Sequence, residues 1–185
     1  MPHTGRETEI KLAVGDAAAA RRVLRAAGFR ISRRRVFERN VIFDTADHAL
    51  RNARRLVRIR QAGGHTTLTY KGPPEVGKHK SRDEIETAVG DSRAAGAVLD
   101  RIGFRPSFRY EKYRTEFQRP AEAGLATLDE TPIGVFIELE GAPRWIDRAA
   151  RALGFSPADY ITRSYAGLYL ERCAASGKQP RDMVF

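Results

Sequence analysis

The sequence predicts an α+β protein: a closed eight-stranded antiparallel β-barrel with amphipathic helices packed on its outside. Eight segments alternate apolar and polar residues as strands do. Three Ala- and Arg-rich segments have the period of amphipathic helices, and the order of elements repeats once along the chain. Because eight antiparallel strands can close on themselves and enclose an interior, these observations favour a barrel made of two related halves.

The strands follow a repeated order of strand, helix and then two or three strands. In each strand the charged residues lie on one face and apolar residues on the other, because side chains two apart share a face. The expected strands are Glu7–Val14, Val36–Asp44, Leu56–Gln61, Thr66–Lys71, Arg82–Val89, Phe108–Gln118, Ala123–Asp129 and Val135–Glu140.

The three expected helices are Asp16–Phe29, Asp91–Phe104 and Pro143–Phe155, and each ends in Gly-Phe. Glycine can adopt the left-handed conformation that terminates a helix, and the phenylalanine after it can fold back onto the last turn. Asp16 and Asp91 are suitable N-caps for the first two helices. These helices offer apolar faces on which the strands can pack.

The chain has the length of one domain, which we place at residues 1–173, with a flexible tail at 174–185. The loop Gly72–Ser81 is rich in Pro, Gly and charge, which is typical of a mobile flap. No apolar run approaches the roughly 18 residues of a membrane span, and the polar start lacks the apolar core of a signal peptide. A single cysteine, Cys173, fits a cytoplasmic protein without disulfides.

Charge gives a first indication of the ligand. Thirty-three Lys and Arg against 23 Asp and Glu give a formal net charge of +10. The expected partners are therefore anions, namely phosphates, nucleic acid or a membrane surface, and charge alone does not choose among them.

The charged faces of the strands are sorted by sign. Glu7 and Glu9 are acidic, whereas Arg58 and Arg60 are both basic. These faces either meet water or face one another inside the barrel, and the sorting favours the second arrangement. The set has seven bases, Lys11, Arg58, Arg60, Lys71, Arg82, Lys112 and Arg114, and seven acids, Glu7, Glu9, Glu84, Glu86, Asp129, Glu138 and Glu140.

Such a balanced interior stays balanced when it admits a triphosphate of charge about −4 together with two divalent cations. The bases would hold phosphate oxygens, and the acids are the hard oxygen ligands that Mg²⁺ or Mn²⁺ prefers. Because unpaired buried charges cost several kcal/mol per ion, we expect a water-filled tunnel, not a dry core.

These residues resemble the CYTH superfamily of triphosphate tunnel metalloenzymes over roughly residues 5–170. The Glu-x-Glu-x-Lys motif of the family is matched by Glu7, Glu9 and Lys11. The other matches are Arg58 with Arg60, Lys71, the Arg82-x-Glu84-x-Glu86 strand, Lys112 with Arg114, and Asp129 followed by Glu138 and Glu140.

The resemblance implies roles for the matched residues. Lys11, Lys112 and Arg114 are the candidate catalytic residues. Glu84 and Glu86 either bind a metal or orient Arg and Lys side chains. The implied phosphate ligands are Lys11, Arg58, Arg60, Lys71, Arg82, Lys112 and Arg114, and the implied ligands of Mg²⁺ or Mn²⁺ are Glu7, Glu9, Asp129, Glu138 and Glu140.

Several segments look most like the class IV adenylyl cyclase branch, among them Ile42–Thr45, Leu128–Gly141 and Tyr160–Tyr165. The implied reaction is conversion of ATP to cyclic AMP and pyrophosphate. The alternative is hydrolysis of inorganic, thiamine or nucleoside triphosphate in the same tunnel. Glu38 and Asn40 stand where cyclase-like members often carry Gln and Asp, which leaves base recognition unassigned.

Two rival functions use the same charges differently. Arg33–Arg35 and Arg54–Arg55 offer a surface for nucleic acid, but a binding module of that kind does not need acids clustered opposite the bases. A phosphate sensor would bind triphosphate with metal and show no turnover. We therefore expect an enzyme with a triphosphate substrate, and leave a homodimer open.

Overall fold

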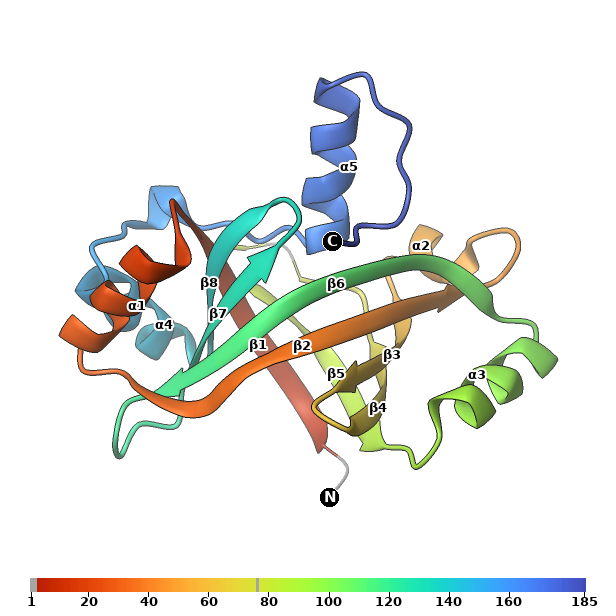
Figure 1. Ribbon diagram of the computed structural model, residues 1–185, viewed down its shortest axis with the longest axis horizontal. Coiled ribbons are helices and arrows are strands. Elements are labelled where there is room, and N and C mark those ends of the chain that lie inside the picture. The colour runs from red at the N-terminus through yellow and green to blue at the C-terminus, as the bar shows by residue number, and fades with distance from the viewer. Residues whose placement is uncertain (1–2, 76) are drawn as a thin grey trace.

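The computed structural model describes residues 3–75 and 77–185 and confirms the closed barrel (Figure 1). All eight strands pair antiparallel, in the ring order β1-β5-β4-β3-β2-β6-β7-β8. The strands are β1 (His3–Val14), β2 (Arg30–Asp44), β3 (Leu56–Ala62), β4 (His65–Lys71), β5 (Lys80–Ala88), β6 (Arg105–Gln118), β7 (Leu125–Thr131) and β8 (Gly134–Glu140).

The order of strands around the ring has the two related halves that the sequence suggests. The first half is β1–β4 and the second half is β5–β8. If each strand of the first half is swapped with the corresponding strand of the second, β1 with β5 and so on, the ring contains the same pairs of neighbouring strands as before. Each half starts with a strand, crosses over through a helix and returns as a long strand, and the long strands β2 and β6 lie side by side (Figure 1). The elements of one half are therefore interleaved with those of the other, and neither half can close alone.

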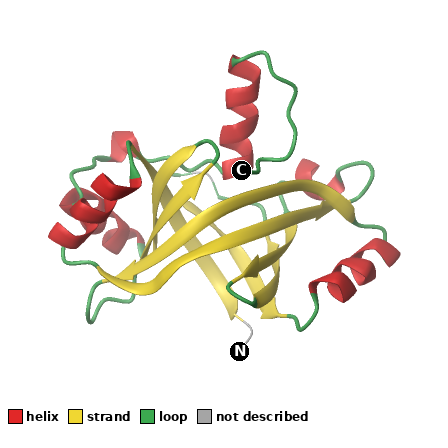
Figure 2. Ribbon diagram, viewed as in Figure 1, coloured by secondary structure: helices red, strands yellow, loops and turns green. Residues whose placement is uncertain are grey.

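The helices are α1 (Ala17–Ala26), α2 (Ala49–Asn52), α3 (Ser92–Arg101), α4 (Pro143–Ala152) and α5 (Tyr165–Ala175), with a 3₁₀ turn at Pro157–Asp159. They lie outside the barrel (Figure 2). Asp16 caps α1 by accepting from the Ala19 N–H at 2.7 Å, and Gly28 ends it at φ 84°. No helix in the described part of the chain is long and apolar enough to span a membrane.

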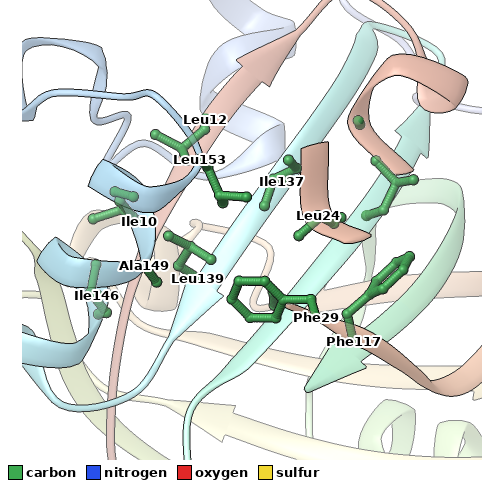
Figure 3. Close-up of a cluster of buried hydrophobic side chains, with 14 of the residues drawn as sticks. Ile10, Leu12, Leu24, Phe29, Phe117, Ile137, Leu139, Ile146, Ala149 and Leu153 are labelled. Carbon is green, nitrogen blue, oxygen red and sulfur yellow. The ribbon is translucent and has the colours of Figure 1, made fainter. Parts of the chain in front are cut away.

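The main apolar core lies between the barrel wall and the helices. Ile10 and Leu12 of β1 point outward to meet Ile146 of α4 and Leu153, the residue that follows α4, and Leu24 of α1 joins the same cluster (Figure 3). All of these side chains are buried. Since the apolar faces are used outside, the alternation along each strand turns the charged faces inward.

A second apolar cluster joins α5 to the barrel through Tyr110, Phe136, Tyr165 and Met183. The sequence predicts a flexible tail at 174–185, and the structure differs: α5 runs to Ala175, and Met183 is 1% exposed. Met183 donates its N–H to the Arg109 carbonyl at 2.9 Å, and its own carbonyl accepts from the Glu111 N–H at 3.0 Å. β7 is shorter than β6 and pairs with it only from Tyr113 to Phe117. The tail forms one further β-bridge on this edge of β6, between Met183 and Tyr110.

The loop between β4 and β5 is also anchored, although its composition is typical of a mobile flap. Glu75 donates its backbone N–H to the Ser81 carbonyl at 2.8 Å and pairs with Arg6. Lys78 and His79 both contact the Asp147 carboxylate, at 2.8 Å and 2.9 Å. Val76 lies outside the described residues.

Candidate active site

All fourteen charged residues that the sequence places on one face line the interior of the barrel. Ten of them are buried, and Arg60, Arg82, Glu86 and Glu140 are half-buried. The strands bring acids and bases from distant parts of the chain into contact, so each buried charge gains a partner that compensates for its lost hydration. Three groups of contacts make up the lining.

The first group joins β1, β4 and β5. Lys71 Nζ lies 2.6 Å from Glu7 and 3.0 Å from Glu84. Glu9 accepts from Lys11 at 3.0 Å and from Lys80 at 2.7 Å, so two lysines share one carboxylate. The register that pairs Glu9 with Lys80 and Glu7 with Arg82 produces this arrangement.

The second group joins β6, β7 and β8 around Asp129, which is 0% exposed. Arg114 binds Asp129 through two N–H groups, at 2.7 Å and 2.6 Å, and also pairs with Glu138. Lys112 and the Tyr165 hydroxyl each donate to Asp129 at 2.8 Å. With four donors on its two oxygens, Asp129 holds the basic pair in place, and its expected metal-binding role stays a prediction.

The third group is centred on Arg58 and Arg60 of β3, which contact residues of β2, β4, β5 and β6. Arg58 donates to the Tyr110 hydroxyl at 3.2 Å and to Thr69 at 3.2 Å, and lies 3.5 Å from Glu86. Arg60 donates to the Asn40 side-chain oxygen at 3.1 Å. These contacts fix the two arginines side by side on one wall, and Glu86 here orients an arginine.

Sequence reasoning missed two buried charges of the lining. Lys80 precedes Arg82 by two residues and shares its face, but the expected strand begins at Arg82. Glu38 lies 3.6 Å from Arg60 and 3.7 Å from Lys112, and its place inside follows from the alternation of β2. Adding Lys80 and Glu38 to the seven bases and seven acids gives eight of each, so the interior stays balanced.

The tunnel also lowers the pKa of most of its acids. Burial raises the pKa of Glu38, but Lys112 and Arg60 outweigh it and bring the value down to about 2. Burial likewise raises the pKa of Glu9, and Lys11 and Lys80 hold it well below its ordinary value. These carboxylates are therefore ionised at neutral pH and keep the bases charged.

Two acids, Glu84 and Glu140, have a raised pKa instead, and Glu140 is the one of the two that does not contact Lys71. It faces Glu9 across the β1–β8 pair, and burial together with the negative charges of Glu7 and Glu9 raises its pKa to about 7. None of the ion pairs found among the described residues includes Glu140. The tunnel thus holds one region where carboxylates lack enough positive charge.

This region fits a divalent cation by its chemistry. Glu7, Glu9 and Glu140 supply the hard oxygen atoms that Mg²⁺ and Mn²⁺ bind, and their mutual repulsion would be relieved by added positive charge. Within residues 3–75 and 77–185, no three Asp, Glu, His or Cys side chains already converge tightly enough to hold a metal. A cation would therefore have to displace Lys71, Lys11 or Lys80 from Glu7 and Glu9.

Comparison with known proteins agrees with this geometry. The model of the CYTH domain matches residues 5–165. The chain belongs to the CYTH domain family. A candidate adenylate cyclase of Methanocaldococcus jannaschii is 27% identical to this CYTH protein over 173 residues, which cover 88% of this chain and 97% of the relative.

Solved structures share the CYTH barrel. A candidate adenylate cyclase of Vibrio parahaemolyticus superimposes with a TM-score of 0.74 at 21% identity, over 89% of this chain and 97% of the other. The PH1819 protein of Pyrococcus horikoshii gives 0.73 at 27% identity, over 90% and 99%. A candidate adenylyl cyclase of Hippeastrum, described as having a dominant triphosphatase activity, gives 0.62 at 20% identity, over 94% and 97%.

Proposed function

We propose that this CYTH protein is a metal-dependent enzyme that processes triphosphates and acts as a class IV adenylyl cyclase on ATP. The observation that carries the proposal is the enclosed lining of eight bases and eight acids. A binding surface for nucleic acid would not need acids buried against its bases, whereas an anion bound together with cations does. The adenylate cyclase description of the archaeal relative supports the choice of reaction.

Binding would exchange partners within the lining. In the structure Lys71, Arg58 and Arg114 are held by carboxylates and by the Tyr110 hydroxyl. Phosphate oxygens would take over these donors, Arg through bidentate contacts and Lys as point charges. Glu7 and Glu9, freed from the bases, would hold Mg²⁺ or Mn²⁺ together with Glu140, and the bound cation would supply positive charge at the phosphate oxygens.

In the cyclase reaction the ribose 3′-oxygen bonds to the α-phosphorus and the bond from that phosphorus to the β-phosphate oxygen breaks. The products are cyclic AMP, pyrophosphate and the proton of the 3′-hydroxyl. Lys11, Lys112 and Arg114 lie together, with Lys11 and Lys112 at 5.1 Å and 5.2 Å from the Tyr165 ring centre. We assign these three residues the stabilisation of charge on the phosphates as the bond breaks.

The second candidate is triphosphate hydrolysis in the same tunnel. It requires only that water reach the terminal phosphorus, so the register of the triphosphate decides between the two reactions. The triphosphatase activity named for the Hippeastrum protein favours keeping this candidate.

Product analysis separates the candidates. The protein is incubated with ATP and, separately, with tripolyphosphate, each with Mg²⁺ or Mn²⁺, and the products are resolved by chromatography. Cyclic AMP and pyrophosphate in equal amounts support the cyclase. Rapid phosphate release from either substrate with no cyclic AMP supports the hydrolase, and no turnover of either contradicts both.

A further inference from the structure

The net charge of the chain lies outside the tunnel. The lining has eight bases and eight acids and is neutral, so it contributes nothing to the formal charge of +10. Removing them from the 33 bases and 23 acids of the sequence leaves 25 bases and 15 acids, and only Lys78 and Lys178 among those 25 bases are lysines. A guanidinium group binds phosphate through two N–H groups and stacks on aromatic rings. The triphosphate site therefore does not explain the excess of arginine.

The excess is concentrated in α1 and the first half of β2. From Ala17 to Phe37 the chain has seven arginines and no acidic residue. Among the described residues, the exposed members of this run that form no ion pair are Arg22, Arg25, Arg30 and Arg34. Their charges are therefore available to an anion that approaches from solvent.

Two bulges interrupt β2 within this run of arginines. Ser32 is one extra residue, because its two neighbours pair with consecutive residues of β6. A second extra residue lies between Arg33 and Val36. A bulge breaks the alternation of faces along a strand and is often found next to a functional site. Here it places two consecutive arginines, Arg34 and Arg35, at the surface.

One carboxylate holds the arginines of α1 next to those of β2. Glu130 of β7 accepts from Arg21 of α1 at 3.0 Å and from Arg35 of β2 at 3.0 Å. Both guanidinium groups contact the same oxygen atom, so the arginines of the two elements belong to one surface. We call this surface the arginine face, and its residues are Arg21, Arg22, Arg25, Arg30, Arg33, Arg34 and Arg35.

Aromatic rings continue the arginine face along the outside of β2 and β6. The guanidinium carbon of Arg35 lies 3.5 Å from the ring centre of Tyr113. The ring centres of Phe37 and Phe185 lie 5.0 Å and 5.3 Å from that of Tyr113. Phe185 is 62% exposed, and Figure 1 shows no helix of the described chain in front of the central parts of β2 and β6. Arginines thus lie beside an accessible row of rings.

We propose that the arginine face and these rings bind a single-stranded nucleic acid on the outside of the barrel. Its phosphates contact the guanidinium groups, and its bases stack on Phe185 and Tyr113. A duplex keeps its bases stacked inside the helix, where these rings cannot reach them. A membrane surface offers phosphate groups but no planar ring for the aromatic side chains to stack on. This activity is separate from the chemistry proposed for the tunnel.

The test removes charge from the arginine face without breaking an ion pair. Arg30→Gln combined with Arg34→Gln removes two exposed arginines that have no partner among the described residues. The matched control is Arg93→Gln with Arg101→Gln, which removes two exposed arginines from α3, at the other end of the molecule (Figure 1). Both double variants lower the net charge by the same amount.

A second pair of variants tests the rings. Phe185→Ala removes the exposed ring beside Tyr113. Val184→Ala is its control, because Val184 is also exposed and is not one of the stacked rings. These variants keep the net charge of the chain.

Binding is measured by fluorescence anisotropy over a range of salt concentrations. The probes are labelled single strands of RNA and of DNA, of one mixed sequence, with a 5′-hydroxyl group in place of a triphosphate. Each has about 20 nucleotides, longer than the roughly 4–16 that a single OB-fold covers. Without a triphosphate, neither probe depends on the tunnel.

We expect Arg30→Gln with Arg34→Gln to raise the Kd near 0.1 M salt by about tenfold or more. It should also lower the slope of log Kd against log salt by about 1.4, roughly 0.7 for each lost phosphate contact. Phe185→Ala should raise the Kd by about fivefold or more and leave the slope unchanged, because stacking releases no counterions. The α3 variant and Val184→Ala should bind as the natural chain does.

Four results overturn the inference. They are no binding of either strand, an equal loss in the α3 variant, an unchanged Kd in Phe185→Ala, and binding to phosphatidylserine vesicles in place of the oligonucleotides. None of the altered residues lines the tunnel, so the result does not depend on which reaction the tunnel performs. Failure of the proposed function would therefore leave this inference standing, and the reverse also holds.

Discussion

At the scale of single residues, Tyr110 shows how the tunnel changes ordinary chemistry. Its hydroxyl accepts from Arg58 at 3.2 Å, and its ring packs in the cluster that contains Met183. Burial opposes ionisation of the phenol, but Arg58, Arg60 and Lys112 outweigh burial and lower the pKa of Tyr110 to about 8. An easily ionised phenol therefore reports on the positive potential of the phosphate site.

We predict that Tyr110 titrates near pH 8, whereas an ordinary tyrosine has a pKa of 10.0. The measurement is the ultraviolet absorbance of phenolate against pH, taken as the difference between the natural chain and Tyr110→Phe. Tripolyphosphate should move the titration to higher pH, because it cancels the charge of the arginines. A difference titration that is unmoved by tripolyphosphate would show that the phosphates bind elsewhere.

The same pKa links Tyr110 to stability. Between pH 8 and pH 10 the folded state holds fewer protons at this residue than the unfolded state, so stability should rise with pH relative to Tyr110→Phe. The contribution is fully present above pH 10 and is lost as the pH falls through 8. Urea midpoints of the two proteins across this window check the sign.

Asp129 is the carboxylate that Lys112 and Arg114 of β6 share. We predict that Asp129→Asn lowers the free energy of unfolding by about 3–5 kcal/mol, because Lys112 and Arg114 are left buried with less compensation. The control is Asp100→Asn, whose carboxylate lies 4.0 Å from Arg105 on an exposed surface and should change stability little. Urea denaturation measures both, and equal effects would contradict the role of Asp129.

At the scale of elements, the contact between the β6–β7 loop and α4 depends on one glycine. A Cβ on Gly124 would lie 2.2 Å from the Trp145 ring, and Trp145 also donates its indole N–H to Glu122. We predict that Gly124→Ala displaces Trp145 and destabilises the protein by about 1–3 kcal/mol, as overpacking does. Trp145 is the chain's single tryptophan, so its fluorescence during urea denaturation reports the change directly.

Gly15 supplies the control for this prediction, because a Cβ there meets no atom within 4 Å and its φ is not positive. Gly15→Ala should leave both the fluorescence and the urea midpoint nearly unchanged. If the urea midpoint of Gly124→Ala equals that of Gly15→Ala, the loop can move away from Trp145 without a loss of folding stability, which contradicts the prediction.

The C-terminal segment is the element whose order is least visible in the sequence. We predict that Met183→Ala costs about 2–5 kcal/mol of stability, since it leaves a cavity beside Tyr110 and Tyr165. Val184→Ala is the matched control, because Val184 is 44% exposed. Thermal unfolding compares the two. Similar melting temperatures would mean that the tail does not hold its place on β6.

The sequence allowed the barrel and most of its lining to be predicted, because parity along a strand is a local property. Gly28 with Asp16 fixed the ends of α1 for the same local reason. Lys80 was missed only because the strand boundary was placed two residues late. Met183 contacts β6, and the Tyr165 hydroxyl bonds to Asp129, so both contacts join segments 36 or more residues apart in the sequence. Contacts of this kind cannot be predicted from a local sequence pattern.

At the scale of the whole molecule, the barrel is built with its charges inside and its main apolar core outside. In the closed ring each of the eight strands has a neighbouring strand on both sides, and the helices cover the apolar outer faces. Eight bases and eight acids then share an enclosed space that is neutral when empty. Any ligand that enters alone must upset that balance.

This balance predicts that triphosphate and divalent cation bind cooperatively. Tripolyphosphate alone brings a charge of about −4 and must compete with the acids for the bases, and a cation alone must compete with the lysines for Glu9. Together they satisfy both sets. We therefore expect Mg²⁺ to tighten tripolyphosphate binding by about 5- to 150-fold, and tripolyphosphate to tighten Mg²⁺ binding by the same factor.

Titration calorimetry in the presence and absence of the second ligand measures both factors, with Mg²⁺ bound by free tripolyphosphate determined separately and subtracted. Glu9→Gln should reduce the coupling in both directions, since it removes a carboxylate that the cation is expected to take from Lys11 and Lys80. Glu171→Gln, which alters an exposed pair with Arg163 outside the tunnel, should leave the coupling unchanged. Equal affinities with and without Mg²⁺ would show that the enclosed acids serve only to hold the bases, and that the tunnel binds its anion without a metal.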